Sequence, residues 1–269
     1  MTIAESIVLG LTQGLTEFIP VSSSGHLLVV QQVLSGAGDH FFLQFINIGT
    51  LAALLVYFRK RIWGILVDVV KKRDWRLVRN LVITTIQVGV VGWFFARIFE
   101  DEDGIFGGVM VVVVMLVVVG LMMIFIDKIP QMSEVKSGKE LSWQRALLVG
   151  VAQMISLVPG TSRSGATIVA GRLTGMKNQA AAEYSFLASI PVMFAVMLKL
   201  MVDYQNREYA YANWEVLVVS NVVAFVSGLI VIGFLMRYLA KRRSLQMFGW
   251  YRVVLAVVIL VVFGVSGSF

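Results

Sequence analysis

The sequence contains no cysteine, only two histidines and few charged residues. The absence of cysteine excludes disulfide bonds, thiolate metal sites and a cysteine nucleophile. Because His26 and His40 are the only histidines, a haem or zinc centre built from several histidines is not expected. Charged residues make up 14% of the 269 residues and hydrophobic residues 58%, whereas an average soluble domain has about a quarter and about a half. Too few polar side chains remain to coat a globule, so the composition predicts an integral membrane protein.

Long apolar runs predict an all-α protein with about six transmembrane helices. A helix needs about 20 apolar residues to cross the hydrocarbon core of a bilayer. The runs of sufficient or nearly sufficient length are Phe41–Phe58, Leu81–Phe99, Ile105–Ile126, Tyr184–Val202, Val216–Met236 and Phe248–Val265. No linker or change of composition marks a separate soluble part, so residues 1–269 are expected to form a single polytopic membrane domain.

The net charge of +7 is typical of nucleic-acid binding, but the positions of the basic residues favour membrane topology and no nucleic-acid partner. Lysines and arginines gather in Arg59–Arg79, Asp127–Arg145 and Arg237–Arg243, between the apolar runs. Short basic stretches of this kind face the cytoplasm. The acidic stretch Glu100–Asp103 and the stretch from Asp203 to Glu215 then lie outside. Inside and outside alternate consistently along the chain.

Two further segments, Ile3–Leu34 and Ala146–Leu173, are apolar but interrupted in the middle. The first contains QGLTEFIPVSSSGH at Gln13–His26, and the second contains QMISLVPGTSRSGA at Gln153–Ala166. An offset of 140 residues aligns Gln13 with Gln153, Ser22 with Ser162, Ser24 with Ser164 and Gly25 with Gly165. A chance match is the alternative, but the alignment predicts an internal duplication, with repeats at about residues 1–126 and 141–265.

The charge pattern gives the two interrupted segments opposite orientations. Because the run that starts at Phe41 must end inside at Arg59, the hairpin before it enters and leaves from the outer face. The second hairpin begins inside at Arg145 and returns inside. The prediction is therefore an inverted-topology repeat with two re-entrant helical hairpins whose breaks meet near the midplane. Non-helical backbone at that depth is tolerated where it lines a wet cavity, so a polar cavity is expected at the breaks.

The first break carries residues suited to phosphate chemistry. Gln13 and Glu17 are four residues apart and therefore share one face of a helix. The hydroxyls of Ser22, Ser23 and Ser24 include a candidate nucleophile, and His26 offers an imidazole for proton transfer. Hydroxyl and backbone N–H groups at the start of the following helix are suited to an oxyanion. The candidate phosphate-binding residues of this break are Gln13, Ser22, Ser24 and Gly25.

The second break adds a cation. Arg163 offers a planar fork of N–H donors that matches a phosphate group. The candidate phosphate-binding residues around it are Thr161, Ser162, Ser164 and Gly165. A carboxylate, a nucleophile, an imidazole and an anion clamp together are typical of phosphoryl transfer.

Each of these residues also has a structural interpretation. Serine and glycine in membrane helices often serve close helix packing. Glu17 and Arg163 alternatively form a structural ion pair, and His26 alternatively caps a helix or binds a carbonyl group. For the whole chain, the alternative is a membrane transporter or a lipid-carrier flippase, because inverted repeats with broken helices are a transporter architecture.

These motifs resemble the undecaprenyl-diphosphate phosphatase family, the bacterial membrane enzymes associated with bacitracin resistance. The resemblance rests on Gln13–His26, on PGTSRSGAT at Pro159–Thr167 and on YSFLASIP at Tyr184–Pro191, together with the length, span count and motif order. It implies hydrolysis of undecaprenyl diphosphate, a polyprenyl diphosphate lipid, to the monophosphate and inorganic phosphate, which regenerates the lipid carrier for cell-wall assembly. It also implies a multi-pass protein in the bilayer of the bacterial plasma membrane, with an active site at the outer face and a possible homodimer.

The resemblance assigns catalytic roles to Glu17, Ser23, His26 and Arg163. Many members have glutamate where this chain has Gln13, so the carboxylate role is expected to fall on Glu17. The resemblance further implies a divalent cation, Mg²⁺ or Ca²⁺, with Glu17 as its protein ligand and the diphosphate supplying several oxygens. The nucleophile stays open between Ser23, His26 and water.

Overall fold

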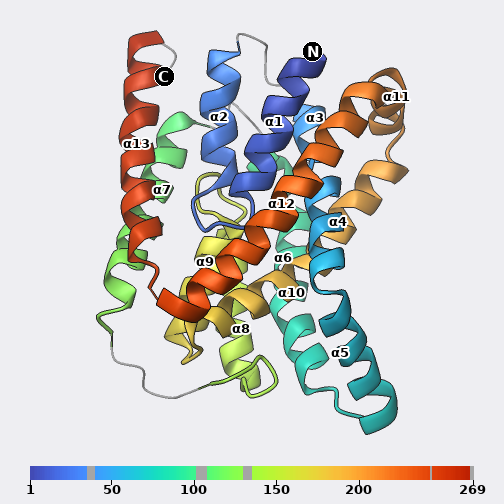
Figure 1. The fold of residues 1–269 in the computed structure, drawn as a ribbon, viewed down its shortest axis with the longest axis vertical. Coiled ribbons are helices and arrows are strands. Elements are labelled where there is room, and N and C mark those ends of the chain that lie inside the picture. The colour runs from blue at the N-terminus through green and yellow to red at the C-terminus, as the bar shows by residue number, and fades with distance from the viewer. Residues whose placement is uncertain (35–39, 101–107, 130–134, 243, 267–269) are drawn as a thin grey trace.

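The computed structural model describes the chain except for residues 35–39, 101–107, 130–134, 243 and 267–269 (Figure 1). The described residues form thirteen helices and no strand, which confirms the all-α prediction. The helices are α1 (Ile3–Thr16), α2 (Ser23–Val33), α3 (His40–Phe45), α4 (Asn47–Tyr57), α5 (Arg59–Lys72), α6 (Arg76–Glu100), α7 (Val109–Ile126), α8 (Trp143–Ile155), α9 (Arg163–Leu173), α10 (Asn178–Val202), α11 (Tyr204–Ala212), α12 (Trp214–Arg242) and α13 (Gln246–Ser266).

Within the described residues, five helices are long and apolar enough to cross a membrane: α6, α7, α10, α12 and α13. A bent pair, Phe41–Tyr57 with Arg59–Lys72, makes a sixth crossing if it is counted as one span. The prediction of about six transmembrane helices is therefore confirmed. The run at Phe41–Phe58 is not one straight helix, however, because it is divided into α3 and α4 and the chain turns by 64° at its end.

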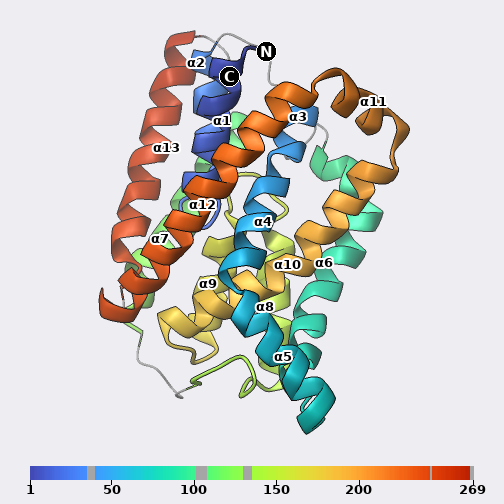
Figure 2. The same cartoon turned by 45° about the vertical axis from the view of Figure 1, so that its right-hand side comes forward.

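The basic stretch that follows this bend forms helix α5, which the charge count alone did not predict. Trp63, Leu66 and Val70 are spaced by three and four residues on α5 and are 68%, 51% and 76% exposed. An amphipathic helix with basic residues and an exposed apolar face is suited to the interface between the hydrocarbon core and water. The bend therefore directs α5 away from the core of the protein (Figure 2).

Ion pairs join the stretches that the charge pattern assigns to the inner side. Lys139 contacts the carboxylates of Asp68 and Asp74, and Arg61 donates to Glu183 at 2.7 Å. These contacts bring the stretch after α4, the stretch after α7 and the start of α10 to the same end of the molecule. In the acidic stretch predicted to lie at the opposite end, residues 101–103 fall outside the described part of the chain.

Each interrupted segment forms two helices joined by a break. Residues 17–22 separate α1 from α2, and residues 156–162 separate α8 from α9. In Figures 1 and 2, α1 and α2 extend toward the end of the molecule that carries α11, whereas α8 and α9 extend toward the end that carries α5. The two breaks lie between these ends. The hairpins thus have the opposed directions that were predicted, and their re-entrant insertion into a bilayer stays a prediction.

The two breaks fold alike at equivalent positions. Ser22 and Ser162 precede α2 and α9 with φ angles of 75° and 67°, a left-handed conformation that non-glycine residues rarely adopt. The hydroxyl of Ser22 accepts from the backbone N–H of Gly25 at 3.3 Å, and that of Ser162 accepts from Gly165 at 3.2 Å. Such strain persists where the surroundings enforce it, which is common at functional sites.

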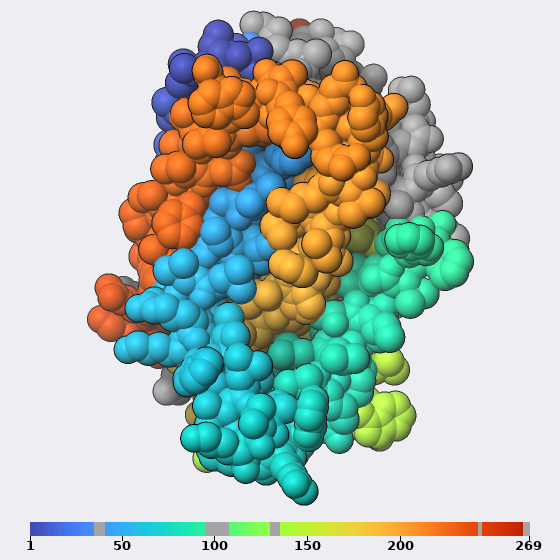
Figure 3. All heavy atoms as spheres, turned by 90° about the vertical axis from the view of Figure 1, so that its right-hand side faces the viewer, coloured from blue at the N-terminus to red at the C-terminus, as the bar shows by residue number. Residues whose placement is uncertain are grey.

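The helix packing follows the same offset. Helix α1 packs against α12 as α8 packs against α6, and α2 contacts α13 as α9 contacts α7. Helix α4 lies between α12 and α10 on the face shown in Figure 3. A Cβ atom at Gly14 would lie 2.6 Å from the carbonyl oxygen of Ala224, so glycine is required where α1 meets α12. This exchange of partners supports the duplication, and the repeat boundaries stay predictions.

Candidate active site

The carboxylate of Glu17, at the end of α1, connects the two breaks. Its Oε1 accepts a hydrogen bond from Nη2 of Arg163 at 2.6 Å, and its Oε2 accepts from Oγ of Ser23 at 2.7 Å. Nε2 of Gln13 donates to the same Oε2 at 3.0 Å. The side chains of Glu17 and Arg163 are 12% and 20% exposed, so their ion pair is largely shielded from water. Four of the predicted residues thus meet in one cluster, although 146 residues separate Glu17 from Arg163.

The local sequence places Ser23 and Arg163 at the first position of α2 and α9. In the 140-residue offset these two positions are equivalent. The first backbone N–H groups of a helix have no acceptor within the helix and favour an anion. The duplication therefore directs two helix N-termini, one carrying a hydroxyl and one carrying a guanidinium, toward the carboxylate of Glu17.

Most of the other predicted phosphate ligands of the first break maintain the break itself. The hydroxyl of Ser22 is buried and accepts from Gly25, as described above, and it lies 3.0 Å from the hydroxyl of Ser24. The hydroxyl of Ser24 also accepts from the backbone N–H of Gly160 at 3.2 Å, which joins the first break to the second. Of these residues, Ser24 is exposed.

The second break is arranged similarly. The hydroxyls of Ser162 and Ser164 lie 3.2 Å apart, and Ser162 accepts from Gly165. The hydroxyl of Ser164 donates to the carbonyl oxygen of Glu17 at 3.4 Å. The hydroxyl of Thr161 is buried and has no hydrogen-bond partner within the described residues. The hydrogen bonds of Ser162, Ser164 and Gly165 thus agree with the structural interpretation. Contact of phosphate with these residues or with Thr161 stays a prediction.

Asn47, at the start of α4, belongs to the cluster although the sequence did not single it out. Its Oδ1 accepts from Nε2 of Gln13 at 2.8 Å, while its Nδ2 donates to the carbonyl oxygen of Leu43 at 3.0 Å. These two bonds fix the amide orientation of both side chains, because Nε2 of Gln13 must donate to Asn47 and to Glu17. The sequence signal that could have identified Asn47 is its position as a polar residue within an apolar run.

A cavity of about 140 Å³ lies against Arg163 and Asn47. Its other walls come from Gln44, from Ile48 and from the C-terminal half of α10, including Met193 and Leu200. Pockets for drug-sized ligands occupy roughly 300–1,000 Å³. The cavity is therefore suited to a small anionic headgroup, and a long lipid tail must lie outside it. The interrupted helices predicted a polar cavity, but most residues that line this cavity are apolar, and its polar part is limited to Arg163, Asn47 and Gln44.

The structure gives His26 hydrogen-bond partners outside the Glu17 cluster. Its Nδ1 lies 2.7 Å from the carbonyl oxygen of Ser22, and its Nε2 lies 2.7 Å from the hydroxyl of Tyr251. A carbonyl oxygen only accepts, so Nδ1 carries the proton and Nε2 accepts from Tyr251. The two rings are also stacked, with centroids 5.5 Å apart. The predicted alternative, a bond to a carbonyl group, is present, and a catalytic role for His26 stays a prediction.

Arg252 of α13 is the largest feature that sequence reasoning missed. It is fully buried, and its guanidinium donates to five backbone carbonyl groups at 2.8–3.4 Å. The acceptors are Pro20 in the first break, Gly160 and Thr161 in the second, and Met115 and Leu116 of α7. The signal was a single ionisable residue inside an apolar span, which in membrane proteins marks a candidate site.

We expect Arg252→Met to destabilise the protein and to lower any activity of the cluster. Methionine fills a similar space but leaves the carbonyl groups of both breaks without a donor, which costs about 3–5 kcal/mol when a buried network loses one partner. The measurement is the melting temperature in detergent, compared with Arg207→Met on exposed α11. Equal melting temperatures for the two variants would show that Arg252 does not fix the breaks.

Comparisons with known proteins cover almost the whole chain. The family model described as bacitracin resistance protein BacA matches residues 6–258. The chain is 36% identical to the undecaprenyl-diphosphatase of Sulfurihydrogenibium sp., with 96% of this chain and 98% of that protein aligned. It is 35% identical to undecaprenyl-diphosphatase 1 of Clostridioides difficile, with 98% and 97% aligned. It is 37% identical to the undecaprenyl-diphosphatase of Thermobifida fusca, with 98% and 92% aligned.

Proposed function

The chain belongs to the bacitracin resistance protein BacA family, and on this basis we propose that it hydrolyses undecaprenyl diphosphate to undecaprenyl phosphate and inorganic phosphate. The protein is thus an undecaprenyl-diphosphate phosphatase that recycles the lipid carrier of cell-wall synthesis. The choice of catalytic residues rests on one observation. The Glu17 carboxylate contacts both the hydroxyl of Ser23 and the guanidinium of Arg163.

The transporter alternative is not favoured. A binding site for a transported solute does not need a hydroxyl that donates to a carboxylate beside an anion clamp, whereas phosphoryl transfer through a serine uses all three. Purified protein in detergent is expected to release phosphate from undecaprenyl diphosphate, because hydrolysis does not require a sealed membrane. Failure to release phosphate in detergent, together with movement of the lipid across a sealed vesicle, would reverse this choice.

The geometry supports a mechanism in which Ser23 attacks the terminal phosphorus. Glu17 accepts the proton of the Ser23 hydroxyl while the Oγ–P bond forms and the bridging P–O bond breaks, and undecaprenyl phosphate leaves. Arg163 and the N-terminus of α2 stabilise the negative charge on the transferring phosphoryl group. Water then cleaves the phosphoserine, Ser23 regains a proton, and inorganic phosphate is released.

Glu17 is preferred over His26 as the base because Glu17 is the group in contact with the Ser23 hydroxyl. Quenching of the enzyme with a denaturant at neutral pH, during turnover of substrate labelled in its terminal phosphate, is expected to trap label on Ser23, and neutral pH would also preserve any label on histidine. Ser23→Ala is expected to lose the label together with phosphate release. Label on His26, or full phosphate release by Ser23→Ala, would contradict the serine mechanism and would favour attack by His26 or by water.

A divalent cation fits the site only in the presence of the diphosphate. Within the described residues, no group of three or more histidine, aspartate or glutamate side chains could hold a metal ion. Glu17 offers a single carboxylate as a partial ligand set, and Mg²⁺ is commonly held by one or two carboxylates plus substrate phosphates. When bound, the cation would neutralise charge on the diphosphate.

EDTA is therefore expected to abolish phosphate release, and added Mg²⁺ or Ca²⁺ to restore it. Because the protein's own ligand set is incomplete, calorimetry with the metal alone is expected to show no tight binding, and binding is expected to appear with the diphosphate substrate. Full activity in EDTA would remove the cation from the mechanism.

The helices and the family make this a multi-pass membrane protein of bacteria. We place it in the plasma membrane with the site open to the outer side. This placement is supported by the cavity, which extends from Arg163 along the half of α10 that leads to the acidic stretch at Asp203. A homodimer stays a prediction.

A further inference from the structure

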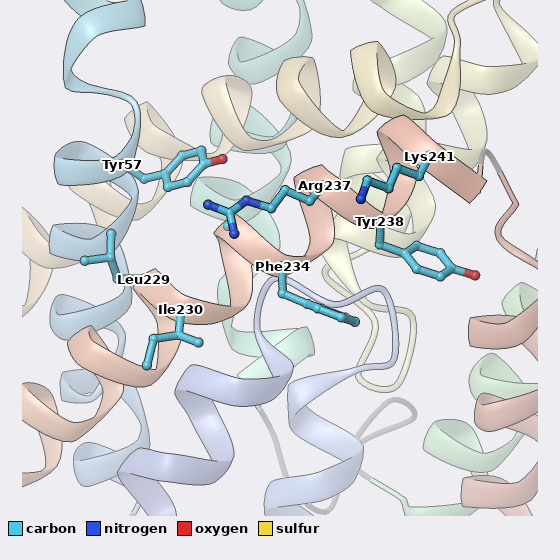
Figure 4. A pocket seen from close by; sticks show the side chains of 8 residues that line it. Tyr57, Leu229, Ile230, Phe234, Arg237, Tyr238 and Lys241 are labelled. Atoms are coloured by element: carbon cyan, nitrogen blue, oxygen red, sulfur yellow. The ribbon is translucent and has the colours of Figure 1, made fainter.

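A groove lies along the last turns of α12, and none of its residues belongs to the hydrolytic cluster (Figure 4). The groove has a volume of about 680 Å³ and is closed on one side by the end of α4. Leu229, Ile230 and Phe234 form an apolar part, and Ile230 and Phe234 are 67% and 52% exposed. Apolar side chains with this exposure face the hydrocarbon of the bilayer.

The other end of the groove is cationic. Arg237 and Lys241 are one helical turn apart and exposed, and among the described residues neither has an acidic partner. In Figure 4 the guanidinium of Arg237 extends toward the hydroxyl of Tyr57, and the ammonium of Lys241 extends back along α12 toward Arg237. Two cations beside a hydroxyl at the end of an apolar groove complement a phosphate group attached to a hydrocarbon chain.

Along the axis of α12 the groove is about as long as half of the hydrocarbon core of a bilayer is thick. It begins at Leu229, next to Gly228, where an added Cβ would lie 3.0 Å from Phe18 beside the active site. It ends at Lys241, within the basic stretch assigned to the cytoplasmic side. At 1.5 Å per residue this part of α12 spans roughly 18 Å, close to half of a hydrocarbon core of about 30 Å.

We propose that this groove binds an anionic phospholipid of the cytoplasmic leaflet, with its phosphate at Arg237 and Lys241 and an acyl chain along Phe234 and Ile230. The site is distinct from the hydrolytic cluster, because the latter lies at the breaks and opens toward the outer half of α10. A second copy of the chain is a poorer occupant. A two-fold contact centred on the groove would bring the same two cations of both copies together.

The test is lipid binding to the full-length protein in a neutral detergent. Native mass spectrometry would compare phosphatidylglycerol with phosphatidylcholine of the same acyl chains. The wild type is expected to prefer phosphatidylglycerol. The variant Arg237→Gln/Lys241→Gln is expected to bind phosphatidylglycerol about 30-fold more weakly, since each basic residue near an anionic headgroup contributes roughly fivefold.

The matched control is Lys71→Gln/Arg73→Gln, which removes the same charge from exposed residues on the same side of the molecule. The control is expected to keep the wild-type preference, and all variants are expected to keep phosphate release, which reports folding. An unchanged preference after Arg237→Gln/Lys241→Gln, or an equal loss in the control, would overturn the proposal.

Because the chain has no cysteine, a crosslinking experiment with the variant Ile230→Cys offers a further check of what occupies the groove. Efficient disulfide linkage between two copies of the Ile230→Cys variant would overturn the proposal and assign the groove to a dimer contact instead.

Discussion

Arg163→Ala is expected to lower the turnover number for phosphate release by about 1,000-fold, within the range for losing an arginine that stabilises a phosphoryl-transfer transition state. The guanidinium already donates to Glu17 at 2.6 Å, and Arg163 lines the small cavity that suits a headgroup. Arg163→Lys keeps the charge but loses the planar fork, so we expect an intermediate loss of about 10- to 100-fold.

The control for this prediction is Arg172→Ala, which removes a second arginine from the same helix, away from the break. We expect Arg172→Ala to release phosphate at nearly the wild-type rate. Full hydrolysis by Arg163→Ala would refute the anion clamp. Equal losses in the two variants would show that α9 needs its basic residues for folding rather than for chemistry.

Glu17→Gln is expected to cause a comparable loss, about 1,000-fold in turnover number, with a smaller change in KM. The substitution keeps the size of the side chain but removes the negative charge that accepts hydrogen bonds from Ser23 and Arg163. It therefore removes the proposed base for Ser23 and the only carboxylate that we assign to a cation.

Glu183→Gln separates this chemical role from the loss of an ion pair. Glu183 accepts from Arg61 at 2.7 Å, a distance close to that of the Glu17 pair, but it lies near the N-terminal end of α10. Its side chain is 33% exposed, and ion pairs of that kind contribute about 0–1 kcal/mol to stability. We expect Glu183→Gln to keep phosphate release. If Glu17→Gln kept it as well, the Glu17–Arg163 contact would be purely structural.

The sequence predicted the meeting of Glu17 and Arg163 because three signals agreed. The breaks repeat at a fixed offset, the charge pattern gives the hairpins opposite orientations, and an isolated ionisable group in an apolar segment needs a partner. The same offset aligned Ser22 with Ser162, and their matching backbone conformations agree with that alignment.

Other parts of the site depend on packing between helices that no periodicity encodes. The stacking of His26 on Tyr251 follows from the contact between α2 and α13, and Asn47 reaches Gln13 because α4 lies against α1. In the sequence, Arg252 is a single cation in an apolar run. Only the structure shows that its guanidinium donates to carbonyl groups of both breaks. Helix α5 was missed for another reason, since counting charges gives the side of a segment but not its secondary structure.

The most direct test of the central claim is a double-mutant cycle on phosphate release with Glu17→Asp, Arg163→Lys and the combined variant. These mild changes keep rates measurable while they disturb one residue from each hairpin. If both hairpins act on a single phosphate group, the combined variant is expected to fall within about tenfold of the slower single variant, because residues that act as a unit are not additive. Losses in kcat/KM that simply multiply would show two independent sites and would contradict the account.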